Sequence, residues 1–366
     1  MAALAVIITH VELLKMEMGF THNWNNVFIF NLGGMGVYFF FVLSGFLITY
    51  LLLAEKKKKN TIAVKKFYIR RILRIWPLYY LVCVLAFFVF PHINFLEISY
   101  LKGSLEQGYW VKLFLFVFML PNLALAMYKP VPHAGQLWSI GVEEQFYIIW
   151  PLIVKYSKKP IKAIVYLSIV ILLAKASLLF MSIKFPSSKL LEITKLFFAM
   201  SKIECMTIGA VGAYFLFNKN NNIVNVISSK WVLLLSIIGA FFLIYITHLT
   251  FIQDGIHIPV SILFLIIILN VAVKGNEINW LNNVVFSNLG KISYGIYMLH
   301  MFVVVFVIRT VSQIFNVSKT FSLFENSLIY IFSVFITIII SYISYHFFEK
   351  VFLNLKKKYT VIRSSS

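Results

Sequence analysis

The sequence predicts an all-α, polytopic integral membrane protein with about ten transmembrane helices and with the N-terminus and C-terminus both cytoplasmic. Of the 366 residues, 61% are hydrophobic and 13% are charged, and the mean hydropathy is +0.88. A soluble domain needs a more polar surface than this composition provides. Apolar runs of about 20 residues, the length that crosses a bilayer core, recur along the whole chain. These observations exclude a soluble globular protein.

The net charge of +20 is carried mainly by short loops between the apolar runs. Such a charge is also found in nucleic-acid-binding proteins, but this placement of Lys and Arg fits the positive-inside rule and anionic lipid headgroups better. Glu55–Arg74 is predicted to be a loop, and because it holds nine basic residues and one acidic residue we predict that it is cytoplasmic. The expected partner is therefore the lipid bilayer and not nucleic acid.

The first apolar segment, Met1–Leu14, is too short to cross a bilayer. No basic residues precede it, so it matches a secretory signal peptide poorly. We interpret it as a truncated first span and predict that the natural reading frame begins upstream of Met1. The second and third spans are predicted at about Gly33–Leu53 and Trp76–Phe90, on either side of the basic segment.

The segment Val111–Ala126 has two alternative interpretations. It is apolar and about 16 residues long, and the polar, proline-containing Tyr128–His133 follows it. If it crosses the membrane, the next span delivers the lysines between Lys155 and Lys162 to the outside, against the positive-inside rule. We therefore predict that it dips into, or lies on, the outer face.

Seven further apolar segments complete the predicted count of ten. They are Ile140–Tyr156, Ile161–Ile183, Thr194–Phe217, Trp231–His248, His257–Val273, Leu289–Arg309 and Leu328–Phe348. Residues 1–366 are then a single membrane domain, with residues 355–366 as a short basic cytoplasmic tail and with no soluble extracytoplasmic domain.

His10 stands alone in an apolar segment. A buried histidine satisfied by a neighbour and a functional histidine are equally good interpretations of its position. An ionisable side chain inside a membrane span is costly to bury, so it is a functional candidate by default. Imidazole is also the side chain best suited to take a proton from a hydroxyl near neutral pH.

Arg71 and Arg74 are three residues apart and share one face of a helix. Arginine this close to hydrocarbon indicates an anionic ligand at the membrane surface, because guanidinium binds phosphate through two parallel hydrogen bonds. The alternative is that the two side chains only set the topology.

A third candidate group lies between Trp138 and Tyr147, where Glu143 and Glu144 begin an apolar helix. Glu143, Tyr147 and Trp150 share one face through their i, i+4, i+7 spacing. The carboxylates can cap the helix beside an interfacial aromatic belt, or they can orient a histidine or bind a sugar hydroxyl.

Lys202 and Glu204 are predicted to form a charge pair inside the bundle, for which a structural role is at least as good an interpretation as a catalytic one. Gly209 and Gly212 are predicted to allow close helix approach. For His300 a packing role is the better interpretation. Cys83 and Cys205 lie in apolar stretches, which argues against a disulfide. The sequence has no P-loop and no His/Cys metal cluster, and Ser44 lacks a Gly-x-Ser-x-Gly frame.

Four ordered motifs resemble the membrane-bound acyltransferase 3 family. They are FFFVLSGFLI, FYIRRILRIWPLYY, LWSIGVEEQFYIIWPL and LGKISYGIYMLH, and together they cover essentially the whole chain. The resemblance implies a ten-helix enzyme that moves an acyl group, commonly acetyl from acetyl-CoA, to a carbohydrate hydroxyl. The expected acceptors are bacterial cell-envelope carbohydrates: polysaccharide, lipopolysaccharide, exopolysaccharide or peptidoglycan. The expected location is the bacterial inner (plasma) membrane.

The resemblance also implies roles for individual residues. His10 matches the catalytic histidine, and Glu143 matches the first acid of a Val-Glu-Glu stretch and is expected to be catalytic. Arg71 and Arg74 match an Arg-x-x-Arg motif and are expected to bind acyl-CoA. The flanking Trp138 and Tyr147 are expected to contact the carbohydrate. No metal or bound cofactor is expected, since acetyl-CoA is a donor substrate.

The chain departs from the family pattern in two places. Many relatives carry His-Thr where this chain has Gln136-Leu137, and His133 is out of register. The family's arginine eleven residues before the catalytic histidine falls before Met1. Some relatives also carry an extracytoplasmic hydrolase-like domain after the last helix, so this chain is expected to act alone or with a separate envelope-biosynthesis partner protein.

The alternative function is a transporter or flippase of a lipid-linked glycan, which would also place polar groups in a helical bundle. Such proteins often contain paired broken helices from internal repeats, and no repeat is evident in the sequence. A catalytically dead binding or scaffold protein is a third interpretation, against which the intact His10 argues.

Overall fold

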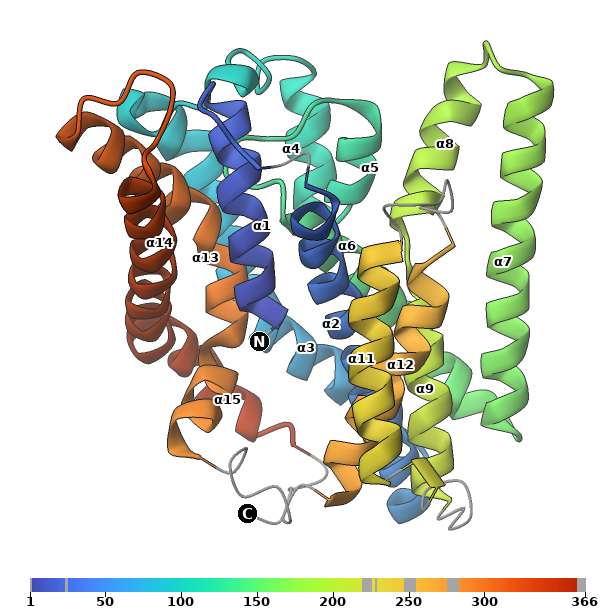
Figure 1. Cartoon of the computed structure of the whole chain (residues 1–366). Helices are drawn as coiled ribbons and strands as arrows, with labels where there is room; N and C mark the ends of the chain where they lie inside the picture. The colour runs from blue at the N-terminus through green and yellow to red at the C-terminus, as the bar shows by residue number, and fades with distance from the viewer. Residues whose placement is uncertain are drawn as a thin grey trace. The chain divides into compact units, whose positions relative to one another are not determined.

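The computed structural model describes residues 2–23, 26–218, 226–227, 229–246, 255–274 and 283–360, and its regular elements there are all helices (Figure 1). The α-helices are α1 Ala2–Glu17, α2 Val27–Lys59, α3 Val64–Val84, α4 Tyr109–Val117, α5 Pro121–Met127, α6 Leu137–Tyr156, α7 Pro160–Lys184, α8 Lys189–Met200, α9 Ile203–Phe217, α11 Lys230–Ile246, α12 His257–Lys274, α13 Val284–Ile314, α14 Leu323–Ser344 and α15 Lys350–Lys357. Short π-helical turns at Leu85–Val89 and Tyr345–Glu349 continue α3 and α14.

Within the described residues, six helical segments are long and apolar enough to cross a membrane. They are Asn31–Lys59, Val64–His92, Pro160–Lys184, Lys189–Phe217, Val284–Ile314 and Leu323–Lys357, and two shorter apolar helices cover Lys230–Tyr245 and His257–Val273. The prediction of an all-α integral membrane protein is confirmed. The count of ten crossings and the cytoplasmic placement of the termini stay predictions.

Several predicted boundaries differ from the structure. The basic segment Glu55–Arg74 is mostly helical, because α2 runs to Lys59 and α3 starts at Val64, and lysine is a good helix former. The predicted span Thr194–Phe217 is broken between α8 and α9, at Ser201 and Lys202.

Two further predicted ranges extend past the described residues. The helix of the Trp231–His248 segment ends at Ile246, and His248 lies outside the described residues. The predicted tail 355–366 begins inside α15, and its residues 361–366 lie outside them too.

By its internal contacts, the chain divides into two compact units. The first unit comprises Met1–Gly36, Arg71–Gly141 and Ser287–Lys358, and the second comprises Val37–Arg70, Val142–Phe286 and Tyr359–Ser366. The boundaries fall within α2, α6 and α13 and near the start of α3, so these helices contribute residues to both units. The predicted site residues are therefore described below unit by unit.

In the first unit, α1 packs along α14 (Figure 1) and against the start of α2. A Cβ atom at Gly33 would lie only 2.8 Å from the Thr9 side chain, so α1 and α2 approach each other more closely than any other residue would allow. The Thr9 hydroxyl bonds to the carbonyl of Ile29 across this contact at 2.9 Å. The close packing fixes the position of α1, the helix that carries His10.

In the second unit, α9 packs against α7 and α12, and α12 packs against α11 (Figure 1). Cβ atoms at Gly209 and Gly212 would lie 2.0 Å from the Val42 carbonyl oxygen and 2.2 Å from a Leu265 methyl. Both glycines therefore allow close helix approach, as predicted.

One lysine of the basic segment has a structural role in the second unit. The Lys56 ammonium donates hydrogen bonds to the carbonyls of Val154, Lys155 and Ser157 at 2.8, 3.0 and 2.8 Å. A cation at the C-terminal end of α6 satisfies carbonyls that the helix leaves without partners and complements its dipole.

Candidate active site

His10 of α1 lies against His300 of α13 in the first unit. The centroids of the two rings are 4.8 Å apart, and Nε2 of His300 is 3.2 Å from Nδ1 of His10. His300 is fully buried, whereas His10 is partly exposed. The prediction of a packing role therefore does not describe His300 fully, because its imidazole also contacts His10, the candidate base.

The partners of the two rings assign their protons. Nδ1 of His300 lies 2.7 Å from the carbonyl oxygen of Tyr297, and Nδ1 of His10 lies 2.9 Å from that of Val6. A carbonyl only accepts, so each Nδ1 carries a proton. In a neutral ring the Nε2 of His300 is then an acceptor, and the His10 Nδ1–H is shared between it and Val6. Among the described residues Nε2 of His10 has no hydrogen-bond partner, so in this tautomer its lone pair is available to a ligand.

A charged cluster holds the neighbouring face of α1 to α14. The Lys15 ammonium lies 2.6 Å from a carboxylate oxygen of Glu12 and donates to the Asn326 side chain at 2.9 Å. The Tyr330 hydroxyl donates to the same Glu12 oxygen. Glu12 and Lys15 are almost completely buried. Their i, i+3 spacing in an apolar helix is a sequence signal that our interpretation missed.

The start of α6 is bonded to the turn of α13 that precedes His300. The Gln136 side chain donates to the Met298 carbonyl at 2.8 Å, and the hydroxyls of Ser139 and Tyr297 are 2.6 Å apart. The Tyr297 hydroxyl also donates to the Gln136 carbonyl at 3.0 Å. Gln136 therefore bonds to the backbone of α13 two residues before His300. In the sequence Trp138 stands between Gln136 and Ser139, and it belongs to the first unit.

Arg71 and Arg74 lie one turn apart on α3, also in the first unit. The Tyr294 hydroxyl of α13 donates to the Ile75 carbonyl at 2.8 Å and so links α3 to the helix of His300. Arg74 is exposed. Among the described residues the hydrogen-bond partners of His10 are the Val6 carbonyl and His300, and neither arginine is one of them. The adjacent Arg70 belongs to the second unit, where it pairs with Glu55 at 3.3 Å.

In the second unit, Glu143 and Tyr147 form a chain of hydrogen bonds with Ser44 of α2. The Tyr147 hydroxyl donates to Glu143 at 2.8 Å, and the hydroxyls of Ser44 and Tyr147 are hydrogen-bonded. One turn further, the Trp150 indole donates to the Thr49 hydroxyl at 2.8 Å. The predicted shared face of Glu143, Tyr147 and Trp150 therefore packs on α2. Ser44 was missed because it matches no nucleophile frame.

The predicted pair of Lys202 and Glu204 is corrected by the structure. Glu204 pairs with Lys175 of α7 at 2.5 Å and with His257 of α12 at 2.6 Å. The Lys202 ammonium lies 3.5 Å from the other nitrogen of His257. The Glu204 carboxylate is thus paired with side chains of two other helices, and not with Lys202, which directly precedes its own helix α9. These contacts link α7, α9 and α12, and the structural role of the cluster stays a prediction.

The part of the chain that the structure describes contains no group of three or more His, Cys, Asp or Glu side chains that could hold a metal ion. Cys83 and Cys205 are both buried free thiols, as expected for core residues.

The comparisons with known proteins fit this picture. The chain is 26% identical to the O-acetyltransferase OatA of Staphylococcus aureus over 95% of its own length and 55% of that protein. It is 34% identical to the peptidoglycan O-acetyltransferase OatA of Listeria monocytogenes over 44% of its own length and 24% of the relative. An uncharacterized protein of Haemophilus influenzae is 34% identical over 37% of this chain and 54% of its own. The chain spans about half the length, or less, of these curated relatives.

No solved structure matches the chain. A family model described as an acyltransferase domain matches residues 1–346, nearly the whole sequence and both units. The chain therefore belongs to the acyltransferase 3 family.

Proposed function

We propose that this protein is a membrane O-acetyltransferase that moves an acetyl group from acetyl-CoA to a hydroxyl of a cell-envelope carbohydrate, with His10 as the general base. The observation that carries the proposal is the His10–His300 pair, which leaves Nε2 of His10 as an unprotonated acceptor. Relatives named O-acetyltransferase and peptidoglycan O-acetyltransferase support this reaction and make peptidoglycan the first acceptor to test.

The chemical step follows from the protonation pattern. Nε2 of His10 removes the proton of the acceptor hydroxyl while the hydroxyl oxygen attacks the thioester carbonyl. A C–O ester bond forms, the C–S bond breaks, and the CoA thiolate leaves and takes up the proton from His10. A positioned base of this kind accelerates transfer by about 10²–10⁴-fold.

His300 acts in this scheme as a positioning residue. Its Nε2 accepts the Nδ1–H of His10, so it fixes the tautomer and stabilises the imidazolium that forms during the reaction. The Tyr297 carbonyl and the bonds from Gln136 hold His300 in place.

Arg71 and Arg74 are proposed to bind the phosphates of CoA at the cytoplasmic membrane surface, where a planar guanidinium suits phosphate geometry. Trp138 and Tyr147 are proposed to contact the carbohydrate. Glu143 is proposed to support catalysis through Tyr147, because its carboxylate accepts a hydrogen bond from the Tyr147 hydroxyl. A separate envelope-biosynthesis protein is a proposed partner.

The proposed topology places ten crossings in the bacterial plasma membrane, with both termini in the cytoplasm. Cysteines introduced at Lys58 and Lys357 should resist membrane-impermeant thiol reagents in intact cells, because both positions lie in basic segments. Rapid labelling of either cysteine would contradict this topology.

The direct experiment is transfer of radiolabelled acetyl from acetyl-CoA to peptidoglycan fragments in membranes that contain the full chain. Wild-type membranes should produce base-labile labelled product, and membranes with His10→Ala should not. His92→Ala is the matched control, since His92 is exposed. Transport of a lipid-linked glycan without acetyl transfer would favour the flippase instead.

A further inference from the structure

Helix α15, in the first unit, has no part in the proposed reaction. None of its residues is buried, and in the described part of the chain it packs chiefly against the π-helical turn Tyr345–Glu349 that precedes it. Burial of apolar side chains against a second helix, which stabilises most helices of the chain, therefore contributes little here. The surface of α15 is open to a partner.

An apolar stripe runs along one side of α15. Val351 and Leu355 are four residues apart, so they share one face, and their side chains are 56% and 43% exposed. Phe347, in the preceding turn, is 81% exposed. Contact of this stripe with water is unfavourable in proportion to its apolar area. The stripe therefore fits an apolar surface better than bulk water.

Exposed lysines flank this stripe. Lys350 and Lys357 are seven residues apart, about two helical turns, so they share one side of α15, and Lys358 follows at its end. Among the described residues none of the three makes an ion pair. The sequence contains no acidic residue after Glu349. The polar side of α15 is therefore uniformly positive.

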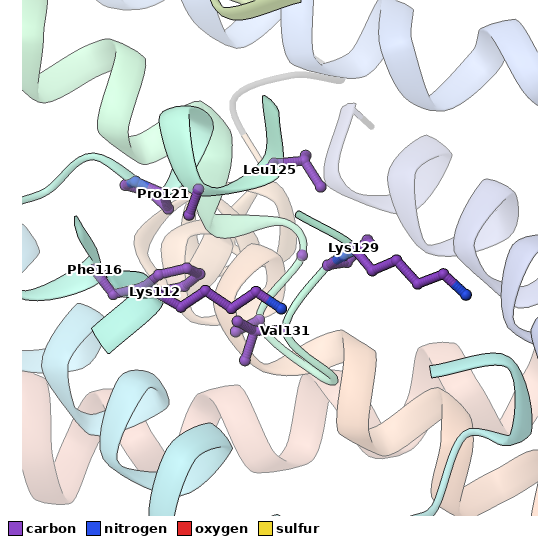
Figure 2. A pocket seen from close by; sticks show the side chains of 10 residues that line it. Lys112, Phe116, Pro121, Leu125, Lys129 and Val131 are labelled. Atoms are coloured by element: carbon purple, nitrogen blue, oxygen red, sulfur yellow. The ribbon is translucent and has the colours of Figure 1, made fainter. Parts of the chain in front are cut away.

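Lysines with structural roles have different surroundings. Figure 2 shows Lys112 in the lining of a small pocket between α4, α5 and the segment 129–135. Its side chain is buried, and its ammonium donates to the Ser104 carbonyl at 2.6 Å. The free volume of this pocket is about 10 Å³, room for about one water molecule. The exposed lysines of α15 differ in that a ligand can reach them.

The length of the preceding helix indicates where α15 lies relative to the membrane. Helix α14 has 22 residues and extends about 33 Å, enough to cross the about 30 Å of a bilayer's hydrocarbon core. Helix α15 follows α14 after the π-helical turn. It therefore begins where the hydrocarbon core ends, at the level of the lipid headgroups.

The π-helical turn changes the direction of the chain, and α15 leaves the line of α14 (Figure 1). Such turns are a common cause of bends in long helices. Glu349 holds the turn, because its carboxylate accepts a hydrogen bond from Ser344 at 3.3 Å. On α13, Gly295 makes room for that carboxylate, since a Cβ atom there would lie 3.2 Å from it. The bend allows α15 to run along the membrane surface.

We propose that α15 lies in the headgroup layer of the membrane and binds anionic phospholipids. Val351 and Leu355 enter the boundary of the acyl chains, as the apolar face of an interfacial amphipathic helix does. The ammonium groups of Lys350, Lys357 and Lys358 contact the headgroup phosphates. The bilayer that surrounds α14 adjoins this surface, which favours lipid over a soluble acidic protein as its partner.

The test is fluorescence quenching by lipid, with the purified full chain in nanodiscs of phosphatidylcholine and phosphatidylglycerol. A fluorophore is attached to Leu355→Cys, with Val351→Cys as a second position, and the unsubstituted chain is the labelling blank because its two cysteines are buried. Each lipid in turn carries a nitroxide near its headgroup. At equal content and low salt, labelled phosphatidylglycerol should quench at least about threefold more strongly than labelled phosphatidylcholine.

A triple variant removes the lysines of this surface: Lys350→Gln, Lys357→Gln and Lys358→Gln. It should lose the preference for phosphatidylglycerol and keep the quenching by phosphatidylcholine, because the apolar stripe remains. All three side chains are exposed, so the fold should persist, and gel filtration checks this. The matched control removes the same charge at exposed positions elsewhere and should keep the preference: Lys158→Gln, Lys184→Gln and Lys189→Gln.

Equal quenching by the two labelled lipids, with all lysines in place, would overturn the proposal, as would a preference that survives in the triple variant. A fluorophore that neither lipid quenches, and that water-soluble iodide does not reach, would show that protein covers α15 and would overturn it too. The assay contains no acetyl-CoA and no carbohydrate, so its outcome is independent of the proposed reaction.

Discussion

Two histidines in apolar helices, His10 in the first unit and His257 in the second, have opposite surroundings. His257 has both ring nitrogens occupied, one by the Glu204 carboxylate and the other by the Lys202 ammonium. His10 has its partners at Nδ1 only, a carbonyl and a neutral imidazole. The ionic network around His257 holds that residue in a structural role. The pairing of His10 with His300 leaves a lone pair of His10 available. Burial alone therefore does not distinguish a base from a structural residue, whereas the occupancy of both nitrogens does.

The largest expected effect separates the two histidines by activity. His10→Ala should lower acetyl transfer by about 10²–10⁴-fold, since the general base is removed. Thermal unfolding in detergent should change little, because one partly exposed imidazole adds little to helix packing. Labelled product from membranes and fluorescence-detected gel filtration measure the two effects. Near wild-type transfer would end the assignment of His10 as base.

The reverse pattern is expected for the ionic network. Glu204→Gln should destabilise the protein by about 3–5 kcal/mol, because it leaves buried cations without their carboxylate. Acetyl transfer per folded molecule should be unchanged. The midpoint of thermal unfolding, with activity normalised to folded protein, checks both. A stable variant with lost activity would move this cluster into the catalytic machinery.

A third histidine, His133, extends the comparison, because it predicts how the stability of the protein depends on pH. His133, in the loop before α6, is buried and donates from Nε2 to the Leu96 carbonyl at 2.9 Å. Its Nδ1 is buried and has no hydrogen-bond partner among the described residues, and burial lowers the pKa of His133 from 6.5 to about 4. The unfolded chain binds this proton more readily than the folded chain does. The contribution of His133 to the free energy of unfolding is therefore fully present above pH 6.5, and about 3 kcal/mol of it is lost as the pH falls toward 4.

This loss is checked by unfolding midpoints between pH 7 and pH 4. His133→Asn is the control, because Asn tolerates the φ of 62° at this position but does not titrate. A variant that loses stability with acid as steeply as wild type would show that other groups cause the effect.

A smaller effect is expected at the partner of His10. His300→Phe should lower kcat by about tenfold, close to the value of one hydrogen bond to a charged group, about 1.5 kcal/mol. His300→Gln should recover part of the rate, because its amide oxygen accepts from His10. The pH–rate profile of the Phe variant should move toward lower pH, since its imidazolium loses that acceptor. A fall in kcat with an unmoved profile would indicate packing only.

The smallest effect concerns the donor. Arg71→Lys and Arg74→Lys should each raise the KM for acetyl-CoA several-fold with little change in kcat, because a point charge does not reproduce the planar fork of guanidinium. Lys66→Arg, on the exposed start of the same helix, is the control. Unchanged saturation curves in both arginine variants would return these residues to a topological role.

The sequence predicted features that one helix encodes by itself. The apolar runs gave the all-α membrane class, and the spacing of Glu143 and Tyr147 gave a contact that the structure contains. Contacts between distant helices were not predictable in this way. His10 and His300 are 290 residues apart, and periodicity describes which face of a helix is apolar but not which helix covers it. For the same reason Glu204 was assigned to Lys202 and not to Lys175 and His257.

Helix α7 carries Lys175 of the ionic network, and only 6% of its apolar window is buried. Its 25 residues extend about 38 Å, more than the about 30 Å of a bilayer's hydrocarbon core. A helix that is too long for its membrane tilts, and one so little covered by protein adjusts mainly to lipid. Acyl-chain length is therefore expected to set the tilt of α7, and with it the separation of Lys175 from Glu204. Hydrophobic mismatch is therefore expected to act directly on the ion pair of Lys175 and Glu204.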